Sequence, residues 1–267
     1  MDEVDAVARD LRAAYHGGPI APVGARIGND LALAYRVQAR NVRAWCDAGR
    51  RRAGFKIGMT SVAARRQFGV DEPDFGVLFD DIGVPSGGEV AWARMFQPRV
   101  EGEIALRIGR DIDCAMAPQD AAHYVDAAIP ALEIADSRIA DWRIAIVDTV
   151  ADNASAGLYV LGRPARDFDF ARLIEATMTL RSGADIVSQG RGASTMGGPH
   201  LALAWLANAL LAHGERLKAG DVVLSGALGP PVPATPGATY AAEISGLGFV
   251  SVSFGAATRG PGDAHRP

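Results

Sequence analysis

The sequence predicts an α+β protein, with a small helical N-terminal part that leads into a β-rich domain. Apolar residues recur at helical spacing over residues 4–15 and again over residues 30–48. From Gly54 onward, short runs of β-branched and apolar residues are broken by Gly, Pro and Asp, which is typical of strands and turns. We therefore expect a helical region over residues 1–53, a β-rich domain over 54–255 and a disordered tail over 256–267.

The first helix groups its apolar residues on one side, and the second is followed by Gly49 as a stop signal. We expect strands in the segments GFKIGMTS, FGVLFDDIGVPSGGEV, VEGEIALRIG, IPALEIADSRI, SAGLYVLG, ATMTLRSGADIVSQG, DVVLSGAL, TYAAEISG and GFVSVSFG. Two more helices are predicted over residues 118–129 and 200–213. The segment DTVADNASAG, residues 148–157, resembles a loop.

The bulk properties exclude several classes of protein. The chain has 267 residues, 49% hydrophobic and 22% charged, with a formal net charge of -4, so it offers no basic surface for nucleic acid. The short cluster at residues 50–52 is interpreted as a solvated helix end. No apolar run approaches the roughly 18 residues that span a bilayer, and the acidic N-terminus does not resemble a secretion signal. Cys46 and Cys114 lack the spacing of a disulfide framework or a zinc site. We expect a cytoplasmic protein that contacts neither membrane nor nucleic acid.

Two carboxylates stand two positions apart in the segment FQPRVEGEIALRIG. Because side chains alternate along a strand, Glu101 and Glu103 share one face while the neighbouring isoleucines and leucine point to the core. An exposed strand edge, with Arg107 or Arg99 as salt partner, would explain this pair without any site. Glu133 lies in the apolar segment AIPALEIADSRI, where an unpaired carboxylate is rarely tolerated. Three carboxylates together would bind a hard divalent cation, Mg²⁺ or Mn²⁺.

Lys56 is one of only two lysines in the chain, the other being Lys218. It stands between apolar residues and is bracketed by Gly54 and Gly58. Burial there would lower its pKa toward the range useful for acid and base catalysis. The alternative is a lysine whose ammonium reaches solvent from a strand edge.

The ordered set of motifs GFKIGMTS, FGVDEPDFGVLFDD, QPRVEGEIAL, ALEIADSRIADW, DTVADNASAG and LSGALGP resembles the hydratase/decarboxylase branch of the fumarylacetoacetate hydrolase superfamily. The resemblance runs from about residue 30 to residue 254 and is closest to the hydratases of aromatic meta-cleavage pathways. It implies that the β-rich domain is a mixed β-roll or sandwich of the fumarylacetoacetate hydrolase C-terminal type.

The resemblance also implies an activity and roles for individual residues. The expected reaction is metal-dependent hydration of 2-hydroxypenta-2,4-dienoate to 4-hydroxy-2-oxopentanoate. The positions that match metal ligands are Glu101, Glu103 and Glu133, with Mg²⁺ or Mn²⁺ as the ion. The positions that match substrate-handling groups are Lys56, Asp74 and Ser155, with Asn153 orienting the loop that carries Ser155; for Asp74, a turn residue after Pro73 is the alternative.

Two departures from the family's pattern bear on the site. Family members have a polar residue where this chain has Gly198 before Pro199, so a contact made there is in doubt, and His200 is not expected to replace it. Gly102 stands where alanine is usual between the two glutamates. We expect this change to face the core and leave the ligands in place.

Three alternative functions would use the same fold or some of the same residues. A decarboxylase of 2-oxohex-3-enedioate (4-oxalocrotonate) would use the same metal site, but LSGALGP and the aspartate of PDFG favour the hydratase. A carbon-carbon bond hydrolase would require a histidine near the metal motifs, where only His123 comes near. A non-catalytic subunit that supports an active partner is a further alternative, against which the retained glutamates and Lys56 argue. The resemblance implies a homo-oligomer with a pentamer as the expected unit, and an association with a pathway aldolase or decarboxylase.

Overall fold

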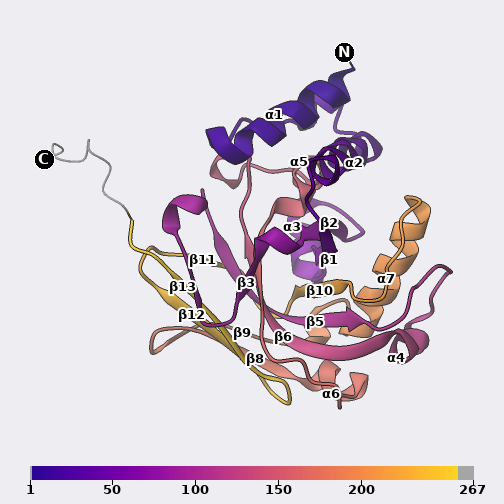
Figure 1. Ribbon diagram of the computed structural model, residues 1–267, viewed down its shortest axis with the longest axis vertical. Coiled ribbons are helices and arrows are strands. Elements are labelled where there is room, and N and C mark those ends of the chain that lie inside the picture. Colours follow the sequence, from indigo (N-terminus) through magenta and orange to yellow (C-terminus); the bar gives the residue numbers. More distant parts are fainter. Residues whose placement is uncertain (1, 258–267) are drawn as a thin grey trace, which may run out of the picture.

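The computed structural model describes residues 2–257, and its ribbon separates into a helical N-terminal part and a β-rich body (Figure 1). The helices are α1 (Glu3–Gly17), α2 (Leu31–Asp47), α3 (Val62–Phe68), α4 (Ala121–Tyr124), α5 (Ile146–Ala151), α6 (Phe170–Glu175) and α7 (Pro199–Ala212). The strands are β1 (Arg52–Gly58), β2 (Asp74–Phe79), β3 (Gly83–Pro85), β4 (Gly88–Val90), β5 (Arg99–Ile108), β6 (Val125–Ala135), β7 (Ala156–Leu161), β8 (Thr177–Ser182), β9 (Asp185–Arg191), β10 (Val222–Ala227), β11 (Val232–Pro233), β12 (Thr239–Ile244) and β13 (Gly248–Phe254). The α+β prediction is confirmed.

The strands form two sheets. The larger has eight strands in the order β2-β1-β10-β5-β6-β7-β3, with β11 added beside β5, and the smaller has five in the order β4-β13-β12-β8-β9. The larger sheet is mixed, because β1 runs parallel to β10 whereas β5 and β6 are antiparallel. The β5–β6 pair is the longest among the described strands, with ten residue pairs and a register shift before the last, and it lies in the middle of the sheet.

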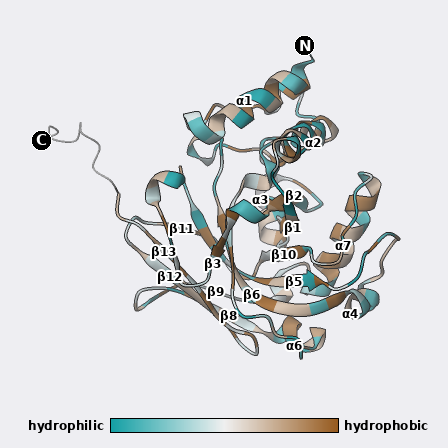
Figure 2. Ribbon diagram, viewed as in Figure 1, coloured by the Kyte–Doolittle hydropathy of each residue, from teal (hydrophilic) through white to brown (hydrophobic). Residues whose placement is uncertain are grey.

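Both faces of the larger sheet are buried. One face packs against the smaller sheet and forms the main hydrophobic core, to which β5 contributes Ile104 and Leu106. The opposite face curls around a second cluster that includes Ala105 of β5 and Leu224 of β10. Brown, hydrophobic residues fill much of the central strands and α7, whereas α1 carries many teal residues (Figure 2). The alternation along each strand therefore decides which of two interiors a side chain enters.

The N-terminal helices pack as the apolar pattern predicts. Asp2 and Asp30 accept hydrogen bonds from the first backbone N–H groups of α1 and α2, which begins each helix. The buried stripe of α1, which includes Val7 and Leu11, packs with α2 and α5 in a hydrophobic cluster of its own. This cluster places α5 and the chain that follows it against the larger sheet.

Two predictions of local structure are wrong. The helix expected over residues 118–129 ends at Tyr124, and Val125 starts β6, because the apolar run that follows is a strand buried on both faces rather than one side of a helix. The segment 148–157, expected to be a loop, contains most of α5 and a short 3₁₀ turn, Asn153–Ser155. Both are buried, which the polar composition of the segment conceals.

The arginine cluster, predicted to be a solvated helix end, follows α2, but only Arg51 fits that description: Arg50 is half-buried over the Phe79 ring and Arg52 begins β1. Each of the three forms an ion pair. Arg50 and Arg51 pair with Asp81 and Asp80, and Arg52 pairs with Glu215. Within residues 2–257, every helix is too short or too polar to cross a membrane. The tail predicted to be disordered lies, from residue 258 on, outside the described residues.

Candidate active site

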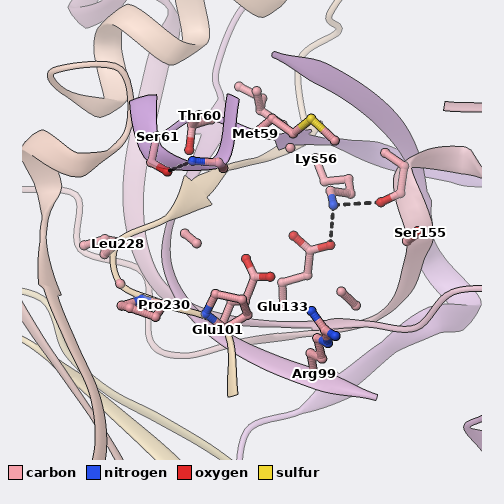
Figure 3. Close-up of a pocket in the computed structure, with 18 of the residues that line it drawn as sticks. Lys56, Met59, Thr60, Ser61, Arg99, Glu101, Glu133, Ser155, Leu228 and Pro230 are labelled. Atoms are coloured by element: carbon pink, nitrogen blue, oxygen red, sulfur yellow. Dashed lines mark hydrogen bonds and ion pairs between the residues drawn. The ribbon is translucent and has the colours of Figure 1, made fainter. Parts of the chain in front are cut away.

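A cavity of about 540 Å³ lies at one end of the curled larger sheet. It collects side chains from β1, β2, β5, β6 and the 3₁₀ turn after α5. Figure 3 shows Glu101 and Glu133 pointing into the cavity toward Lys56. Of the predicted site residues, the cavity is lined by Lys56, Asp74, Glu101, Glu133 and Ser155.

The three predicted metal ligands come together through strand register. Glu101 on β5 stands directly opposite Glu133 on β6, and Glu103 stands opposite Ala131. Because residues two apart on a strand share a face, Glu103 joins the same group. One carboxylate oxygen from each glutamate lies within 4.8 Å of the others. The sequence predicted the shared face, and the structure adds the pairing of the two strands.

Glu103 is fully buried beside a bulge in β10. The register between β5 and β10 shifts between Leu224 and Ala227, and Gly226 there has φ 107°, a backbone conformation that favours glycine. The bulge points the Gly226 N–H at Glu103 Oε2, at 2.8 Å. Glu103 Oε1 is buried and finds no hydrogen-bond partner among the described residues. A cation would satisfy this oxygen, since an orphaned buried carboxylate oxygen is costly.

The raised pKa values in the cluster also favour a bound cation. Burial, with Glu133 and then Glu101 as charged neighbours, raises the pKa of Glu103 well above its ordinary value. Burial and Glu133 likewise raise the pKa of Glu101 to about 7. Glu101 and Glu103 thus resist being ionised beside their charged neighbours, as expected where like charges share a site without a cation.

Lys56 forms a buried ion pair with Glu133, with Nζ 2.7 Å from Oε1, and donates a hydrogen bond of 2.9 Å to the Ala154 carbonyl. Burial alone would lower its pKa, but attraction to Glu133, then to Asp74 and Glu101, outweighs burial and raises the pKa above the ordinary value. The prediction of a lowered lysine pKa is therefore wrong, because it counted the apolar flanks and omitted the carboxylates. Lys56 is a fixed positive charge in this cavity.

Asp74 lies beside Lys56 because of a glycine. Asp74 on β2 pairs with Gly58 on β1, two residues beyond Lys56 on the same face. A Cβ at Gly58 would collide with Asp74 Oδ1, so the missing side chain makes room for the carboxylate. Asp74 is 1% exposed, and neither of its oxygens is satisfied by another residue within 2–257. Burial raises its pKa to about 6, even though Lys56 opposes the shift.

The turn Asn153–Ser155 brings the remaining predicted residue to the cavity. The Asn153 side chain forms two hydrogen bonds with the backbone of β2: it accepts from the Val77 N–H at 2.8 Å and donates to the Val77 carbonyl at 2.9 Å. Ser155 follows at the cavity wall, and its buried hydroxyl has no hydrogen-bond partner in the described part of the chain. The expectation that Asn153 orients the loop agrees with these bonds.

Arg99 and Trp142 are cavity residues to which sequence reasoning gave no role in a site. The Arg99 guanidinium lies over the Trp142 ring at 4.2 Å from its centroid, and Trp142 Nε1 donates to the Gln97 carbonyl at 3.0 Å. The sequence alone suggests for Arg99 only the role of a salt partner on an exposed strand edge. Trp142 stands in the ADW that closes one motif, but its approach depends on a left-handed backbone, φ 53°, that a sequence pattern does not reveal.

The two departures from the family's pattern have different surroundings. A Cβ at Gly102 would meet the flexible Met178 side chain, with Sδ at 2.8 Å, so this position faces the core as predicted. Gly198 precedes α7 without a side-chain cap, and a Cβ there would lie 2.7 Å from His200 Cε1. His200 lies against Phe170 and is not among the residues that line the cavity. It therefore supplies no substitute for a polar group at position 198.

The residues present fit a divalent cation. The donors are carboxylate oxygens, which hard cations prefer, and Glu103 Oε1 is an orphaned acceptor in the middle of them. The cluster holds the carboxylates Glu101, Glu103, Glu133 and Asp74 and the cations Lys56 and Arg99, so its formal charge is −2. A bound divalent ion would neutralise it.

The chain is similar to known proteins over most of its length. The fumarylacetoacetate (FAA) hydrolase C-terminal family matches residues 32–254. A relative named 2-keto-4-pentenoate hydratase 2, from Dechloromonas aromatica, is 46% identical over 94% of this chain and 97% of its own. A TodF product hydratase from Pseudomonas putida is 46% identical over 89% of this chain and 90% of its own.

Among solved structures, a 4-oxalocrotonate decarboxylase from Pseudomonas putida G7, complexed with magnesium and adipate, superposes with a TM-score of 0.88. It is 31% identical, with 94% of this chain and 97% of that chain covered. Sequence and fold thus agree over nearly the whole length. The chain belongs to the fumarylacetoacetate hydrolase C-terminal family.

Proposed function

We propose that this protein is a metal-dependent hydratase that adds water to 2-hydroxypenta-2,4-dienoate, the enol form of 2-keto-4-pentenoate, and yields 4-hydroxy-2-oxopentanoate in the catabolism of aromatic compounds. The observation that carries the proposal is one cavity that joins three clustered glutamates to a buried lysine and a buried aspartate. The hydratase names of relatives at 46% identity support the reaction class.

Glu101, Glu103 and Glu133 would hold the cation, with Mg²⁺ or Mn²⁺ favoured by the all-oxygen donors. A cation bound there would act as a Lewis acid toward the carboxylate and 2-oxygen of the substrate. The protein's own contribution is to keep the three carboxylates in place. All three lie on the β5–β6 strand pair, whose register leaves them little freedom.

Lys56 would attract the negative charge of the substrate. Its ion pair with Glu133 and its bond to the Ala154 carbonyl hold the ammonium charged and oriented, so it suits an electrostatic role rather than that of a base. The buried Ser155 hydroxyl is free to hydrogen-bond substrate or water at the same wall.

Asp74 is the group best suited to move a proton. Its pKa of about 6 allows it to exist in both protonation states near neutral pH, as a general acid or base requires. Neither carboxylate oxygen accepts a hydrogen bond from another residue within 2–257. In the proposed reaction Asp74 would first take the proton from the enol oxygen and deliver it to C5, which gives the 2-keto tautomer with a C3–C4 double bond. It would then take a proton from water while the hydroxide adds to C4, and deliver that proton to C3.

The nearest alternative is a decarboxylase, favoured by the similarity of fold to the 4-oxalocrotonate decarboxylase. One assay separates the two: incubate the purified protein with Mg²⁺ and each substrate, follow the ultraviolet absorbance, and identify the products. The proposal expects 4-hydroxy-2-oxopentanoate from 2-hydroxypenta-2,4-dienoate. Turnover restricted to 2-oxohex-3-enedioate, with release of CO₂, would overturn it in favour of the decarboxylase.

We further propose that the protein is a homo-oligomer and that it associates with an aldolase or a decarboxylase of the same pathway. The support is the family resemblance alone, and light scattering of the purified protein, with and without such a partner, tests it. A non-catalytic subunit would retain the fold without binding a cation. Calorimetric titration with Mg²⁺ and with Mn²⁺ separates that alternative and compares the two ions.

A further inference from the structure

The turn that carries Ser155 is strained. Asn153, Ala154 and Ser155 all have left-handed backbone angles, with φ of 55°, 52° and 52°. Such a conformation is unfavourable for residues that have a Cβ, and three in a row are uncommon. Surrounding contacts must therefore hold the turn in shape. Its shape matters, because it aims the Ala154 carbonyl at Lys56 and the Ser155 hydroxyl at the cavity.

The side chain of Arg138 joins the two ends of this turn. Its Nη2 donates to the carbonyl of Asp152, just before the turn, at 2.9 Å, and its Nη1 donates to the carbonyl of Ala156, just after it, at 3.1 Å. Its Nε donates to Asp152 Oδ1 at 2.7 Å. Arg138 and Asp152 are both 2% exposed. A planar guanidinium suits this task because it presents its donors in a fixed fork.

The guanidinium is covered in turn by the N-terminal helix. Its Cζ lies 4.3 Å from the centroid of the Tyr15 ring, and Tyr15 packs edge-on against Trp45 of α2. Tyr15 belongs to α1, which precedes the region 32–254 that the family match covers. The aromatic face shields the buried cation and restricts its movement.

We propose that Arg138 is a positioning residue for the reaction, which clamps the turn Asn153–Ser155 in its left-handed shape, and that Tyr15 of α1 holds the clamp closed. The inference rests on the proposed function, because it assigns Lys56 and Ser155 to substrate handling. It adds a role for a helix outside the family's matched region. Arg138 and Asp152 would act by holding the turn in shape and would not contact the substrate.

The test compares Arg138→Lys and Tyr15→Leu with Tyr15→Phe, which keeps the ring. Lysine cannot reach both flanking carbonyls as a fork. We expect Arg138→Lys to lower kcat on the order of 10²-fold, since a displaced site group costs about that much, while KM changes by less than about threefold. Tyr15→Leu should lower kcat by a smaller factor, and Tyr15→Phe should keep the wild-type kcat.

Two measurements separate positioning from mere stability. The control variant Leu180→Ala removes a fully buried side chain from β8, in the other sheet, and lowers the melting temperature without touching the turn. Amide hydrogen exchange of the peptide 150–157, measured without substrate, should quicken in Arg138→Lys and Tyr15→Leu and stay unchanged in Leu180→Ala. In the background Ser155→Ala, Arg138→Lys should cost less than it does alone, because part of its effect passes through Ser155.

If Arg138→Lys and Tyr15→Leu lose melting temperature but keep wild-type kcat and wild-type exchange over 150–157, the ion pair is only structural and the proposal is overturned. Should Arg138→Lys fail to fold, Tyr15→Leu against Tyr15→Phe decides by the same readouts. If the wild-type protein does not hydrate the dienoate, the proposed function fails, while the exchange measurement still decides whether the clamp holds the turn.

Discussion

Replacing Glu103 by glutamine should have opposite effects on the metal-free and metal-loaded protein. Glutamine has nearly the same volume, its carbonyl can accept from the Gly226 N–H as Oε2 now does, and its amide can donate to the neighbouring carboxylates. The change therefore removes a charge while preserving the packing of a residue that is 0% exposed.

The magnitude follows from the spacing of the cluster. Two unit charges 4.8 Å apart repel by about 3.5 kcal/mol at an effective dielectric constant of about 20. Proton uptake limits this penalty, since the pKa of Glu103 is already raised, so we expect Glu103→Gln to stabilise the metal-free protein by about 1–3 kcal/mol. For a domain of this size that corresponds to a rise in Tm of about 2–4 °C per kcal/mol.

With metal the order should reverse. At a free Mg²⁺ concentration 1,000 times Kd, binding stabilises the wild-type protein by about 4.1 kcal/mol, which exceeds the advantage of Glu103→Gln in EDTA, and the variant should lose most of this gain together with turnover. Scanning calorimetry in EDTA and in MgCl₂ measures both effects, with Glu243→Gln, an exposed position on β12, as the matched control. A Glu103→Gln variant that keeps the wild-type response to Mg²⁺, or that is destabilised in EDTA, would refute the ligand assignment.

Three further substitutions test the surroundings of the cluster. Asp74→Asn should stabilise the metal-free protein by about 3 kcal/mol at pH 8 and by nearly nothing at pH 4. Burial raises the pKa of Asp74 from 3.8 in the unfolded chain to about 6 in the folded protein, so the protonated side chain costs no stability below pH 3.8, whereas the wild-type protein loses stability as the pH rises through 6. Urea unfolding in EDTA at the two pH values measures the difference. Gly58→Ala should lower kcat on the order of 10²-fold without loss of fold, because the new Cβ would displace the Asp74 carboxylate at Oδ1. Wild-type kinetics in this variant would show that the position of the Asp74 carboxylate is unimportant for turnover. Gly102→Ala should leave kcat/KM within about twofold, because only the flexible end of Met178 must move, and a large loss of Mg²⁺ affinity in that variant would contradict the core-facing assignment.

Strand parity is the part of the site that the sequence predicts well. The alternation in VEGEIAL places Glu101 and Glu103 on one face, and β5 has that alternation in the structure. The pairing of Glu101 with Glu133 depends on the register between β5 and β6, which a single sequence does not determine. Two signals in the sequence connect Glu133 with the other glutamates: its apolar flanks, and the family resemblance of the motif ALEIADSRIADW that contains it.

The errors of prediction have two physical causes. Burial and left-handed backbone leave little trace in composition, and charges that approach from other strands are not visible in the local sequence. Residues 148–157 are rich in polar and small side chains, so they resemble a solvated loop, yet they form a buried helix and a strained turn. For Lys56, the flanking residues indicated desolvation correctly. The sign of its pKa shift was decided by Glu133 and Asp74, which reach it from other strands.

The elements that build the site differ in rigidity, and this difference separates their functions. Glu101 and Glu133 sit within the ten-pair register of β5 and β6, where a displacement would break a sheet. Ser155 and the carbonyl that orients Lys56 sit on a strained turn, which depends on Arg138 for its shape. Substitutions around the strand pair should therefore act mainly on cation affinity, and substitutions around the turn should act mainly on kcat at saturating metal. A titration of Mg²⁺ activation in both classes of variant measures this division, and a turn variant whose defect disappears at high Mg²⁺ would contradict it.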